Sequence, residues 1–424
     1  MTPSVAPCPD SPAQSTPAAP PGPASVSAAA SSEMSAPDQR APVRRDRLVA
    51  RRVLFDAIPR EAWDRLLAVT ACATPFSRWT FHRAWWDGYG ESAHEDYLIC
   101  FPAGGRGALD PASIVAIVPL MHRHEVEPDD SILRTAIRHA PRLAPTPIPD
   151  RAKAVFFAAS YHADYATLLC DRAGLPDVAA AVVETLASGP DPSHGPDDWD
   201  VVDLRRLRAD DPALPALEAA FRAAADRYGW AVTREQEDVC PVLRVDTDDW
   251  DTYLNTLTTK DRHEIRRKVR RAEAAGPVEF EDVAAPASAV DEFIAIHQAR
   301  WGADGLFPET PGGERSRHFF RRLAELEGPG GALRLGRLRA AGRTIFMCVG
   351  FHQRDTVYYY NAGSDPDARA LSPGVVGVAH YLRHGLAAGY RVFDFLRGNE
   401  PYKYSWGAVD EPIYRLIVTR GADR

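Results

Sequence analysis

The sequence lacks the features that mark several large classes of protein. No apolar run approaches the roughly 20 residues needed to cross a bilayer, and no charged-then-apolar leader pattern opens the chain. The six cysteines are scattered and form no C-x-x-C pair, so neither a zinc knuckle nor a disulfide framework is indicated. G-x-S-x-G, P-loop and dinucleotide-binding patterns are also missing, which argues against hydrolase, kinase and dehydrogenase functions. We expect a cytoplasmic protein with reduced thiols.

A surplus of positive charge is lacking as well. The net charge is −8, so there is no general argument for binding nucleic acid or anionic membranes. With 424 residues, of which 45% are hydrophobic, the chain has enough apolar material for more than one core, and two or three domains are expected. Residues 1–45 are rich in Pro, Ala and Ser and are predicted to be a disordered tail, because they have little to bury.

Alternating helical and strand patterns after residue 50 predict a mixed α/β (α+β) protein. The C-terminal half shows the clearer series. Apolar spacing and turn residues predict two helices, three antiparallel strands, a further helix and a last strand, over residues 290–301, 314–328, 332–363, 375–388 and 390–396.

The N-terminal half repeats this order in a weaker form. Its predicted helices and strands cover residues 76–89, 96–101, 113–124, 152–159, 175–187 and 199–207. The last strands of the two halves align as "VVDLRR" and "VFDFLR", so both carry D-x-x-R at the same ordinal place. We infer two copies of one α/β unit, an N-terminal domain at 50–235 and a C-terminal domain at 236–424.

The segment "ALSPGVVG" predicts an open helix start. Ser372 is a candidate N-cap, Pro373 suits the first helical position, and Gly374 and Gly377 have no side chains to block a close approach. Free N–H groups at a helix start suit a phosphate or pyrophosphate. The same residues also occur where a helix is merely capped, so both interpretations stay open at this point.

The segment "DFLRGNEPYKYSWG" places charge at the end of a strand. Asp394 shares its strand face with Val392 and Leu396, so its carboxylate must be paired or functional. Arg397 is the partner nearest in sequence, and a buried Asp–Arg pair is the structural interpretation. On that interpretation, Asp203 and Arg206 pair in the same way in the first half. Three further side chains follow in a loop, where ligand groups often gather: Tyr402, Lys403 and Trp406.

Together these segments resemble the C-terminal signature of GNAT-superfamily acyltransferases of the cellulose-biosynthesis-associated (CelD-like, BioF-like) group, which are similar to Fem-type aminoacyltransferases. The pattern is a strand ending in aromatics, then G-x-D-P, S-P-G, D-F-x-x-G and Y-K. It is matched by Tyr358 to Tyr360, Gly363, Asp365, Pro366, Ser372 to Gly374, Asp394, Phe395, Gly398, Tyr402 and Lys403. The resemblance covers most of the chain after residue 50. It implies two GNAT-like folds in tandem, each a mixed, mostly antiparallel sheet flanked by helices.

The resemblance also implies roles for particular residues. It implies acyl transfer from acyl-CoA, such as acetyl-CoA, to a small-molecule or saccharide amine, with Asp394 as the base or as the group that orients the amine. Tyr402 is expected to be the acid for the leaving thiolate or to stabilise it, and the backbone around Tyr360 and Asn361 is expected to hold the oxyanion. Arg397 and Lys403 are expected to bind anionic groups. The donor is expected to lie on Tyr360, Asn361, Ser372, Pro373, Gly374, Val375, Val376 and Gly377. The phosphate signature common in small GNAT enzymes is absent, so an acyl carrier protein or aminoacyl-tRNA is also open as donor.

The basic segment at residues 260–271 predicts a helix with a cationic surface. That surface is either simply solvated or binds a polyanion such as a CoA phosphate or tRNA. Fem-type relatives use aminoacyl-tRNA and often carry a coiled-coil arm, but heptads are absent here, which favours CoA over tRNA. A catalytically silent GNAT-like binding module is the alternative from another functional class.

Two histidine patterns carry no predicted metal site. His380 and His384 have the i, i+4 spacing of a zinc pair, but no third ligand is apparent from the sequence. The segment "MHRH" at 121–124 is predicted to be the end of a strand. We therefore expect no metal and no tightly bound cofactor.

Overall fold

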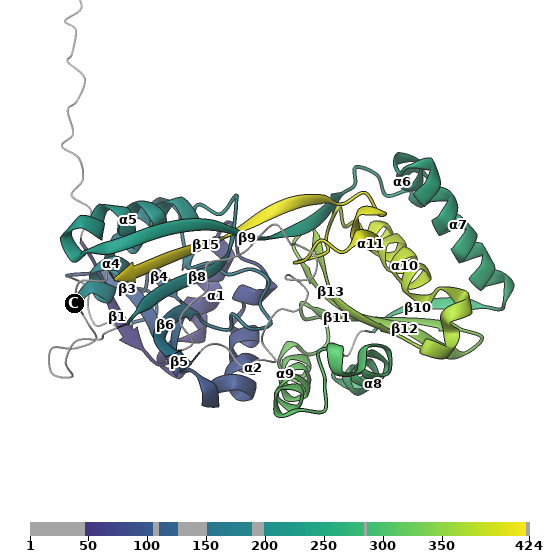
Figure 1. The fold of residues 1–424 in the computed structure, drawn as a ribbon, viewed down its shortest axis with the longest axis horizontal. Helices are drawn as coiled ribbons and strands as arrows, with labels where there is room; N and C mark the ends of the chain where they lie inside the picture. The colour runs from purple at the N-terminus through teal and green to yellow at the C-terminus, as the bar shows by residue number, and fades with distance from the viewer. Residues whose placement is uncertain (1–46, 105–109, 126–150, 189–198, 284–285, 421–424) are drawn as a thin grey trace, which may run out of the picture. The chain divides into compact units, whose positions relative to one another are not determined.

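The computed structural model describes residues 47–104, 110–125, 151–188, 199–283 and 286–420, which belong to one compact unit (Figure 1). The tail at 1–45, predicted to be disordered, lies outside the described residues. Among the residues that are described, no helix is both long and apolar enough to pass through a membrane.

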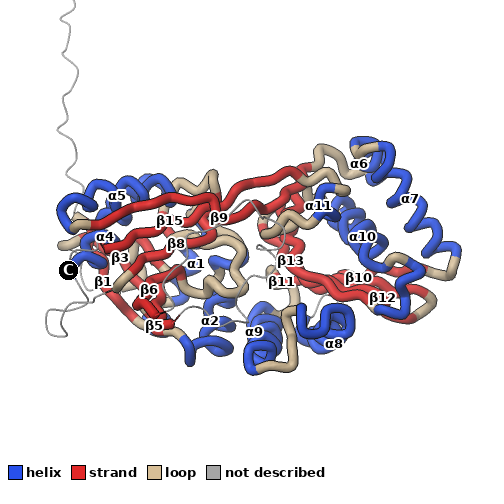
Figure 2. Tube along the Cα trace, in the orientation of Figure 1, coloured by secondary structure: helices blue, strands red, loops and turns tan. Residues whose placement is uncertain are grey.

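The fold is mixed α/β, as the sequence predicts, and its main element is one sheet of eleven strands (Figure 2). The sheet order is β10 (Val278–Val283), β11 (Leu333–Ala340), β12 (Arg343–Gln353), β13 (Thr356–Ser364), β14 (Val392–Asp394), β9 (Trp230–Arg244), β15 (Val409–Arg420), β8 (Val201–Arg208), β6 (Arg151–Phe157), β5 (Leu120–Glu125) and β2 (His94–Glu95). A second sheet of four strands has the order β1 (Leu48–Val53), β3 (Tyr97–Pro102), β4 (Ala116–Val118) and β7 (Leu169–Cys170).

Helices cover both parts of the main sheet. In the first half these are α1 (Arg60–Val69), α2 (Trp79–Tyr89), α4 (Leu175–Ser188) and α5 (Ala213–Tyr228). In the second half they are α6 (Trp250–Thr256), α7 (Thr259–Ala274), α8 (Val290–Trp301), α9 (Pro311–Glu327), α10 (Pro373–Ala387) and α11 (Pro401–Tyr404). The predicted helices at 290–301, 314–328 and 375–388 correspond to α8, α9 and α10, and the basic segment forms α7 with Thr258 as its N-cap.

The long strands β9 and β15 join the two halves (Figure 1). They pair antiparallel from Trp230↔Arg420 to Val242↔Val409, so the C-terminal strand returns alongside the strand that leaves the first half. The sheet is therefore continuous across the junction that the sequence predicts near 229–249. Neither β15 nor α1 or α5 is predicted by the sequence analysis.

The two aligned D-x-x-R segments occupy the same position in the two halves. In the first half, parallel β6 and β8 pair up to Phe156↔Asp203. In the second half, parallel β13 and β14 pair up to Tyr358↔Asp394. The alignment of the two segments is therefore confirmed in register as well as in order. One predicted strand is wrong: residues 113–124 are divided at Pro119 into β4 and β5, which belong to different sheets.

Candidate active site

The strands β13 and β14 separate directly after Tyr358 and Asp394. Beyond that point β13 continues along β12, whereas Phe395 turns away and its N–H donates to Pro241 O of β9, 3.0 Å away. A β-bulge accompanies the separation, because Tyr359 pairs with Gly350 and Asn361 pairs with Val349. Tyr360 is therefore left without an opposite residue on β12, and the edge of β13 bends away from its neighbour.

This separation opens a cavity of about 1070 Å³. Its walls come from the second half of β13, the start of α10, the loop after β14, and the helices α7 and α8. The first half of the chain contributes Tyr161, His162 and Asp164 from the loop after β6. The cavity is large enough for a ligand of cofactor size, and it lies where two copies of the repeated unit meet.

The start of α10 forms part of the cavity wall. Gly374 has no neighbouring atom within 4 Å of where a Cβ would lie, and it lines the cavity with Val375. The first turn of α10 carries no acidic side chain, so the positive end of the helix dipole is not neutralised from within. Arg271 of α7 adds a cation there, because its Nη2 donates to the Ser372 Oγ at 2.5 Å. The wall is therefore suited to an anion.

Four of the eight residues predicted to bind the donor do not line the cavity. Ser372 is the N-cap of α10, as predicted, but its side chain makes no cap hydrogen bond, and its φ is 54°. A Cβ at Gly377 would lie 2.3 Å from Phe346 Cδ1, so this glycine allows close packing and does not open the helix to a ligand. Val376 is fully buried. Gly374, Val375, Tyr360 and Asn361 line the cavity, but Ser372, Pro373, Val376 and Gly377 do not.

Asp394 does not line the cavity, and its expected contact with the ligand needs correction. Phe393 packs against Gly385 of α10, so the alternation of the strand turns Asp394 to the opposite side of the sheet. There Oδ2 accepts from the Tyr165 hydroxyl and Oδ1 from the Leu396 N–H, both at 2.8 Å. Burial raises the pKa of Asp394 to about 6. The carboxylate is a buried link between the two halves.

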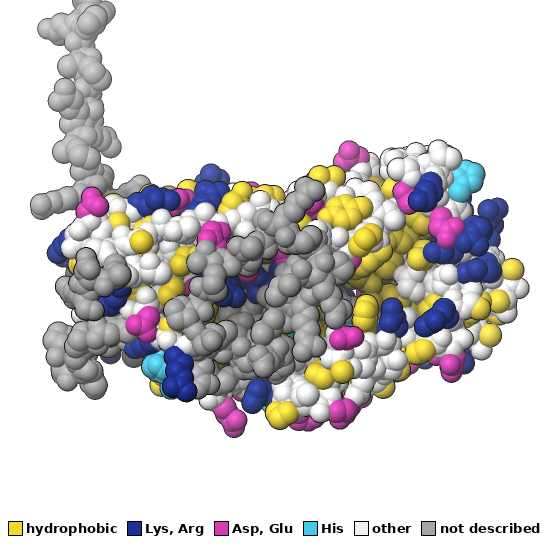
Figure 3. Space-filling view, viewed as in Figure 1, with side chains coloured by type: hydrophobic (Ala, Val, Ile, Leu, Met, Phe, Trp, Pro, Cys, Tyr) yellow, Lys and Arg dark blue, Asp and Glu magenta, His cyan; other side chains and the backbone are white. Residues whose placement is uncertain are grey.

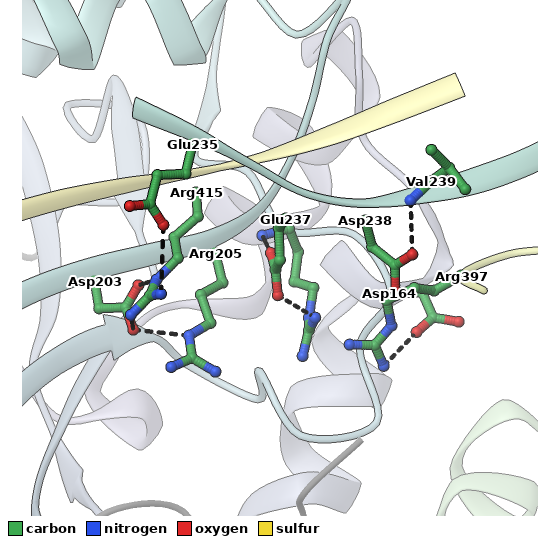
Figure 4. A network of polar contacts seen from close by, with 10 residues as sticks. Asp164, Asp203, Arg205, Glu235, Glu237, Asp238, Val239, Arg397 and Arg415 are labelled. Atoms are coloured by element: carbon green, nitrogen blue, oxygen red, sulfur yellow. Dashed lines mark hydrogen bonds and ion pairs between the residues drawn. The ribbon is translucent and has the colours of Figure 1, made fainter. Parts of the chain in front are cut away.

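Arg397 and Lys403 are held by protein groups. Arg397 lines the cavity, but its Nη2 pairs with Asp164 at 3.0 Å and not with Asp394 (Figure 4). Lys403 is 3% exposed, and its Nζ donates to the carbonyls of Leu396, Arg397 and Gly398 at 2.8–3.0 Å. Because an ammonium has three protons, this clamp leaves none for a ligand, and the expected anion-binding role of Lys403 needs correction.

In the first half, Asp203 and Arg206 of D-x-x-R do not pair with each other, although the sequence suggests that pair. Asp203 accepts from Arg415 of β15 and from Arg205 (Figure 4). Arg206 instead pairs with Glu237 of β9. These pairs join β8, β9 and β15, so they contribute to the junction of the two halves.

Tyr402 lies in the cavity wall. It lines the cavity beside Phe395, and 43% of it is exposed. Enclosure of its hydroxyl, and then the charge of Glu400, raise the pKa of the phenol above its ordinary value. The hydroxyl is therefore protonated at neutral pH and can donate to a ligand.

Sequence reasoning missed two histidines in the cavity wall. His297 of α8 is 1% exposed, and its Nε2 donates to Asn361 Oδ1 at 3.1 Å, because that oxygen also accepts from the Ala362 N–H. Its Nδ1 is buried and makes no hydrogen bond within the described part of the chain. Burial lowers the pKa of His297 to about 4, so this nitrogen carries a free lone pair at neutral pH.

His162 comes from the first half and lies behind the bulge. Its Nδ1 is 3.1 Å from the Tyr360 hydroxyl, and its Nε2 is 2.9 Å from the Tyr89 hydroxyl. Burial lowers the pKa of His162 to about 3, so the ring is neutral. In the sequence both histidines lie among apolar residues of ordinary appearance, and no spacing marks them.

Comparison with known proteins relates much of this site to one family model. Residues 259–404, which contain α7 to α11 and most of the cavity wall, match the model of the Acetyltransferase (GNAT) domain. The second half of the chain therefore contains a GNAT-type acetyltransferase domain. The search of curated proteins found no match to this chain.

Some solved structures are also similar to this chain. The crystal structure of FemX has a TM-score of 0.51 and 10% identity, and the match covers 84% of this chain and 96% of that one. A tandem GNAT protein from the clavulanic acid biosynthesis pathway has a TM-score of 0.44 and 12% identity, over 89% and 100% of the two chains. The C-terminal domain of a putative lysylphosphatidylglycerol synthetase from Agrobacterium fabrum has a TM-score of 0.44 and 13% identity, over 86% and 91%.

Proposed function

We propose that the chain is an N-acyltransferase that moves an acyl group from a CoA thioester to an amine of a small molecule or saccharide. The observation that carries this proposal is the cavity where β13 and β14 separate, with the open start of α10 in its wall. The GNAT-type domain over residues 259–404 supports the reaction class. The grouping with cellulose-biosynthesis-associated proteins remains part of this proposal.

The donor lies between β13 and α10 in this proposal. Its pyrophosphate is bound by the N–H groups of the first turn of α10, at Gly374 and Val375, where the helix dipole is favourable. Arg271 of α7 supplies positive charge near that turn. The amide-containing arm of the donor follows the edge of β13, which β14 no longer covers after Tyr358.

The transfer needs a positioned amine, a donor to the carbonyl oxygen and an acid for the sulfur. The amine nitrogen attacks the thioester carbon, a C–N bond forms and the C–S bond breaks. His297 lines the cavity and orients the attacking amine, while the proton lost by nitrogen leaves through water in the cavity. A backbone N–H at the Tyr360 bulge holds the developing oxyanion. The Tyr402 hydroxyl donates a hydrogen bond to the departing thiolate, which takes up a proton from water in the cavity.

Asp394 acts through other groups in this scheme. Its carboxylate fixes the Leu396 N–H and the Tyr165 hydroxyl, and Leu396 lines the cavity. It is therefore a positioning residue and not the base.

The aminoacyl-tRNA-dependent transferase is the second candidate, and the cationic surface of α7 is the observation that favours it (Figure 3). Much of that charge is already neutralised, however. Arg267 and Lys268 both pair with Glu264, and Arg266 pairs with Asp251. The remaining charge suits a small polyanion better than a long phosphate backbone, which needs many unpaired cations.

The donor can be identified with the full chain. Thermal unfolding is measured with acetyl-CoA, longer acyl-CoAs, free CoA, adenosine nucleotides and aminoacyl-tRNA, because a ligand at a hundred times its dissociation constant adds about 2.7 kcal/mol. Thiol release is then followed with a panel of amines. We expect stabilisation by CoA thioesters and amine-dependent thiol release. Stabilisation by aminoacyl-tRNA alone supports the second candidate, and stabilisation by non-thioester ligands alone supports a binding module.

His297→Ala tests the proposed orientation of the amine. We expect kcat/KM for the amine to fall by about 100-fold, as expected for loss of a group that positions the substrate, while the donor dissociation constant is unchanged. His318→Ala is the matched control, because His318 is an exposed histidine of α9 outside the cavity wall. Equal rates for the two variants would remove His297 from the scheme.

A further inference from the structure

Three histidines lie together at the edge of the large sheet, away from the cavity. They come from two strands, His94 from β2 and His122 and His124 from β5. Neither the main cavity nor the small one in the first half is lined by any of them. The proposed acyl transfer therefore leaves this group unexplained.

The strand register brings the three rings to one face. His94 pairs directly with His122 in the antiparallel ladder, and His124 is two residues further along β5, on the same face as His122. Ring centroids lie 4.7 Å apart for His94 and His122, and 5.4 Å apart for each ring and His124. One ring nitrogen from each histidine lies within 4.8 Å of the other two.

These separations are close to those of a metal site. Zinc–nitrogen bonds of 2.0–2.1 Å in a tetrahedron place ligand nitrogens about 3.3 Å apart, so small side-chain rotations suffice to close the group around an ion. Two of the rings, His94 and His124, are exposed, so they can make such rotations without repacking a core.

Asp96 gives the central ligand its orientation. Its Oδ2 lies 2.5 Å from His122 Nδ1, and Asp96 itself is 7% exposed, with Arg52 3.9 Å from its other oxygen. A carboxylate on Nδ1 fixes the proton there and turns Nε2 outward with its lone pair free. Histidines that bind a metal through one ring nitrogen commonly donate the other N–H to a carboxylate.

We propose that His94, His122 and His124 form a binding site for a divalent transition-metal ion, such as Zn²⁺, that fastens β2 to β5. Three imidazoles suit zinc, nickel or copper, whereas magnesium and calcium require oxygen ligands. The fourth position is left to water. β2 has only two residues and is the last strand of the eleven-stranded sheet, so its backbone pairing with β5 is short. A metal ion bound to histidines of both strands would hold this edge strand in place.

This proposal corrects the expectation that the chain has no metal site. The sequence segment at 121–124 is a strand end, as predicted, but its two histidines gain a third ligand from a residue 28 positions earlier. His380 and His384 of α10 remain outside any such group in the described part of the chain.

The test uses the full chain, produced without a histidine tag and stripped with a chelator. Zinc is titrated by calorimetry, and cobalt is titrated while its visible absorption reports tetrahedral coordination. We expect one equivalent of tight binding and a rise in the unfolding temperature with zinc but not with magnesium. His318→Ala, at an exposed histidine of α9, should bind as the wild type does.

The variants separate the ligands from their support. His122→Ala should lose at least the roughly 10–100-fold in zinc affinity that changes to supporting residues cost, and Asp96→Asn should lose affinity in that range while keeping one equivalent. Circular dichroism checks that both remain folded. Zinc uptake by His122→Ala equal to that of the wild type, or wild-type protein without the tetrahedral cobalt spectrum, would overturn the proposal. Neither result bears on acyl transfer, which is assayed separately.

Discussion

The two halves of the chain share one arrangement of strands, but within the described residues only the second half has a large cavity beside its parallel pair. In each half a parallel pair ends at the aspartate of D-x-x-R, Asp203 in the first half and Asp394 in the second. Beyond that point the second half has a cavity of about 1070 Å³, and the first half has one of about 10 Å³. The same topology is therefore compatible with an open site and with a filled core.

Side chains account for the difference. The small space in the first half is enclosed by large groups that include Trp63, Phe76 and Tyr165. The helix that follows it, α4, carries Asp177 in its first turn, whereas the first turn of α10 carries no acid. A carboxylate at a helix start already neutralises the dipole that would attract a phosphate. The first half thus supports the cavity, to which it lends three residues of the wall.

The largest effect on stability should come from the clamp on the turn after β14. Lys403→Met leaves three buried carbonyls without a donor and Glu400 without its cation, so we expect a loss of about 3–5 kcal/mol. In the first half the corresponding turn is fixed by Glu237, which accepts from the Arg206 N–H. Urea unfolding of Lys403→Met and Glu237→Gln compares the two clamps. A loss below about 1 kcal/mol for Lys403→Met would show that the clamp is not essential.

The next effect concerns donor binding. Gly374→Asp gives α10 the acidic first turn that α4 already has, and the open space at Gly374 accepts the side chain. We expect the CoA thioester to bind about 10- to 100-fold more weakly, which corresponds to about 1.4–2.7 kcal/mol, with unfolding unchanged. Asp177→Ala in the first half is the control and should leave binding unaltered. Calorimetric titration measures both, and full affinity in Gly374→Asp would place the phosphates elsewhere.

A smaller, pH-dependent effect is expected at Asp394. Burial raises its pKa to about 6 in the folded chain, from an ordinary 3.8, so the protonated form is favoured by folding. The stability that this provides is complete below pH 4 and is lost as the pH rises through 6, at a total cost of about 3 kcal/mol, of which about 1.3 kcal/mol falls between pH 5 and pH 7. Asp394→Asn should remove this dependence, so the stability of the variant relative to wild type should rise between pH 5 and pH 7. A constant difference across that range would contradict the burial argument.

Much of the second half could be predicted from the sequence because its elements are periodic and punctuated. The helix at 290–301 and the three strands between 332 and 363 have clear apolar spacing and turn residues, and the structure has them at nearly those bounds. The final strand β15 was missed, although its pairing with β9 is what makes the sheet continuous. Strands that pair with partners far away in the sequence cannot be recognised from a local pattern of residues.

The site was predicted less completely. The sequence shows which residue types are present, but it does not show in which direction their side chains point. The D-x-x-R spacing suggests a local ion pair, but Leu396 has a φ of 57°, and Arg397 is directed to Asp164 from the other half. Asp394 was expected to face the ligand. The sequence shows that Asp394 is buried, but it does not show which side of the strand packs against α10. His297 and His94 depend on neighbours that only the folded chain supplies.

Hydrogen exchange in the presence of acetyl-CoA tests the central claim most directly, because it reports on both halves in one experiment. The account predicts slower exchange at residues 374–378 of α10 and 359–364 of β13, and no change at two segments of the first half outside the cavity wall, 175–180 of α4 and 152–157 of β6. Protection of the first half's segments, or of neither half, would contradict the claim that the donor binds where β13 and β14 separate.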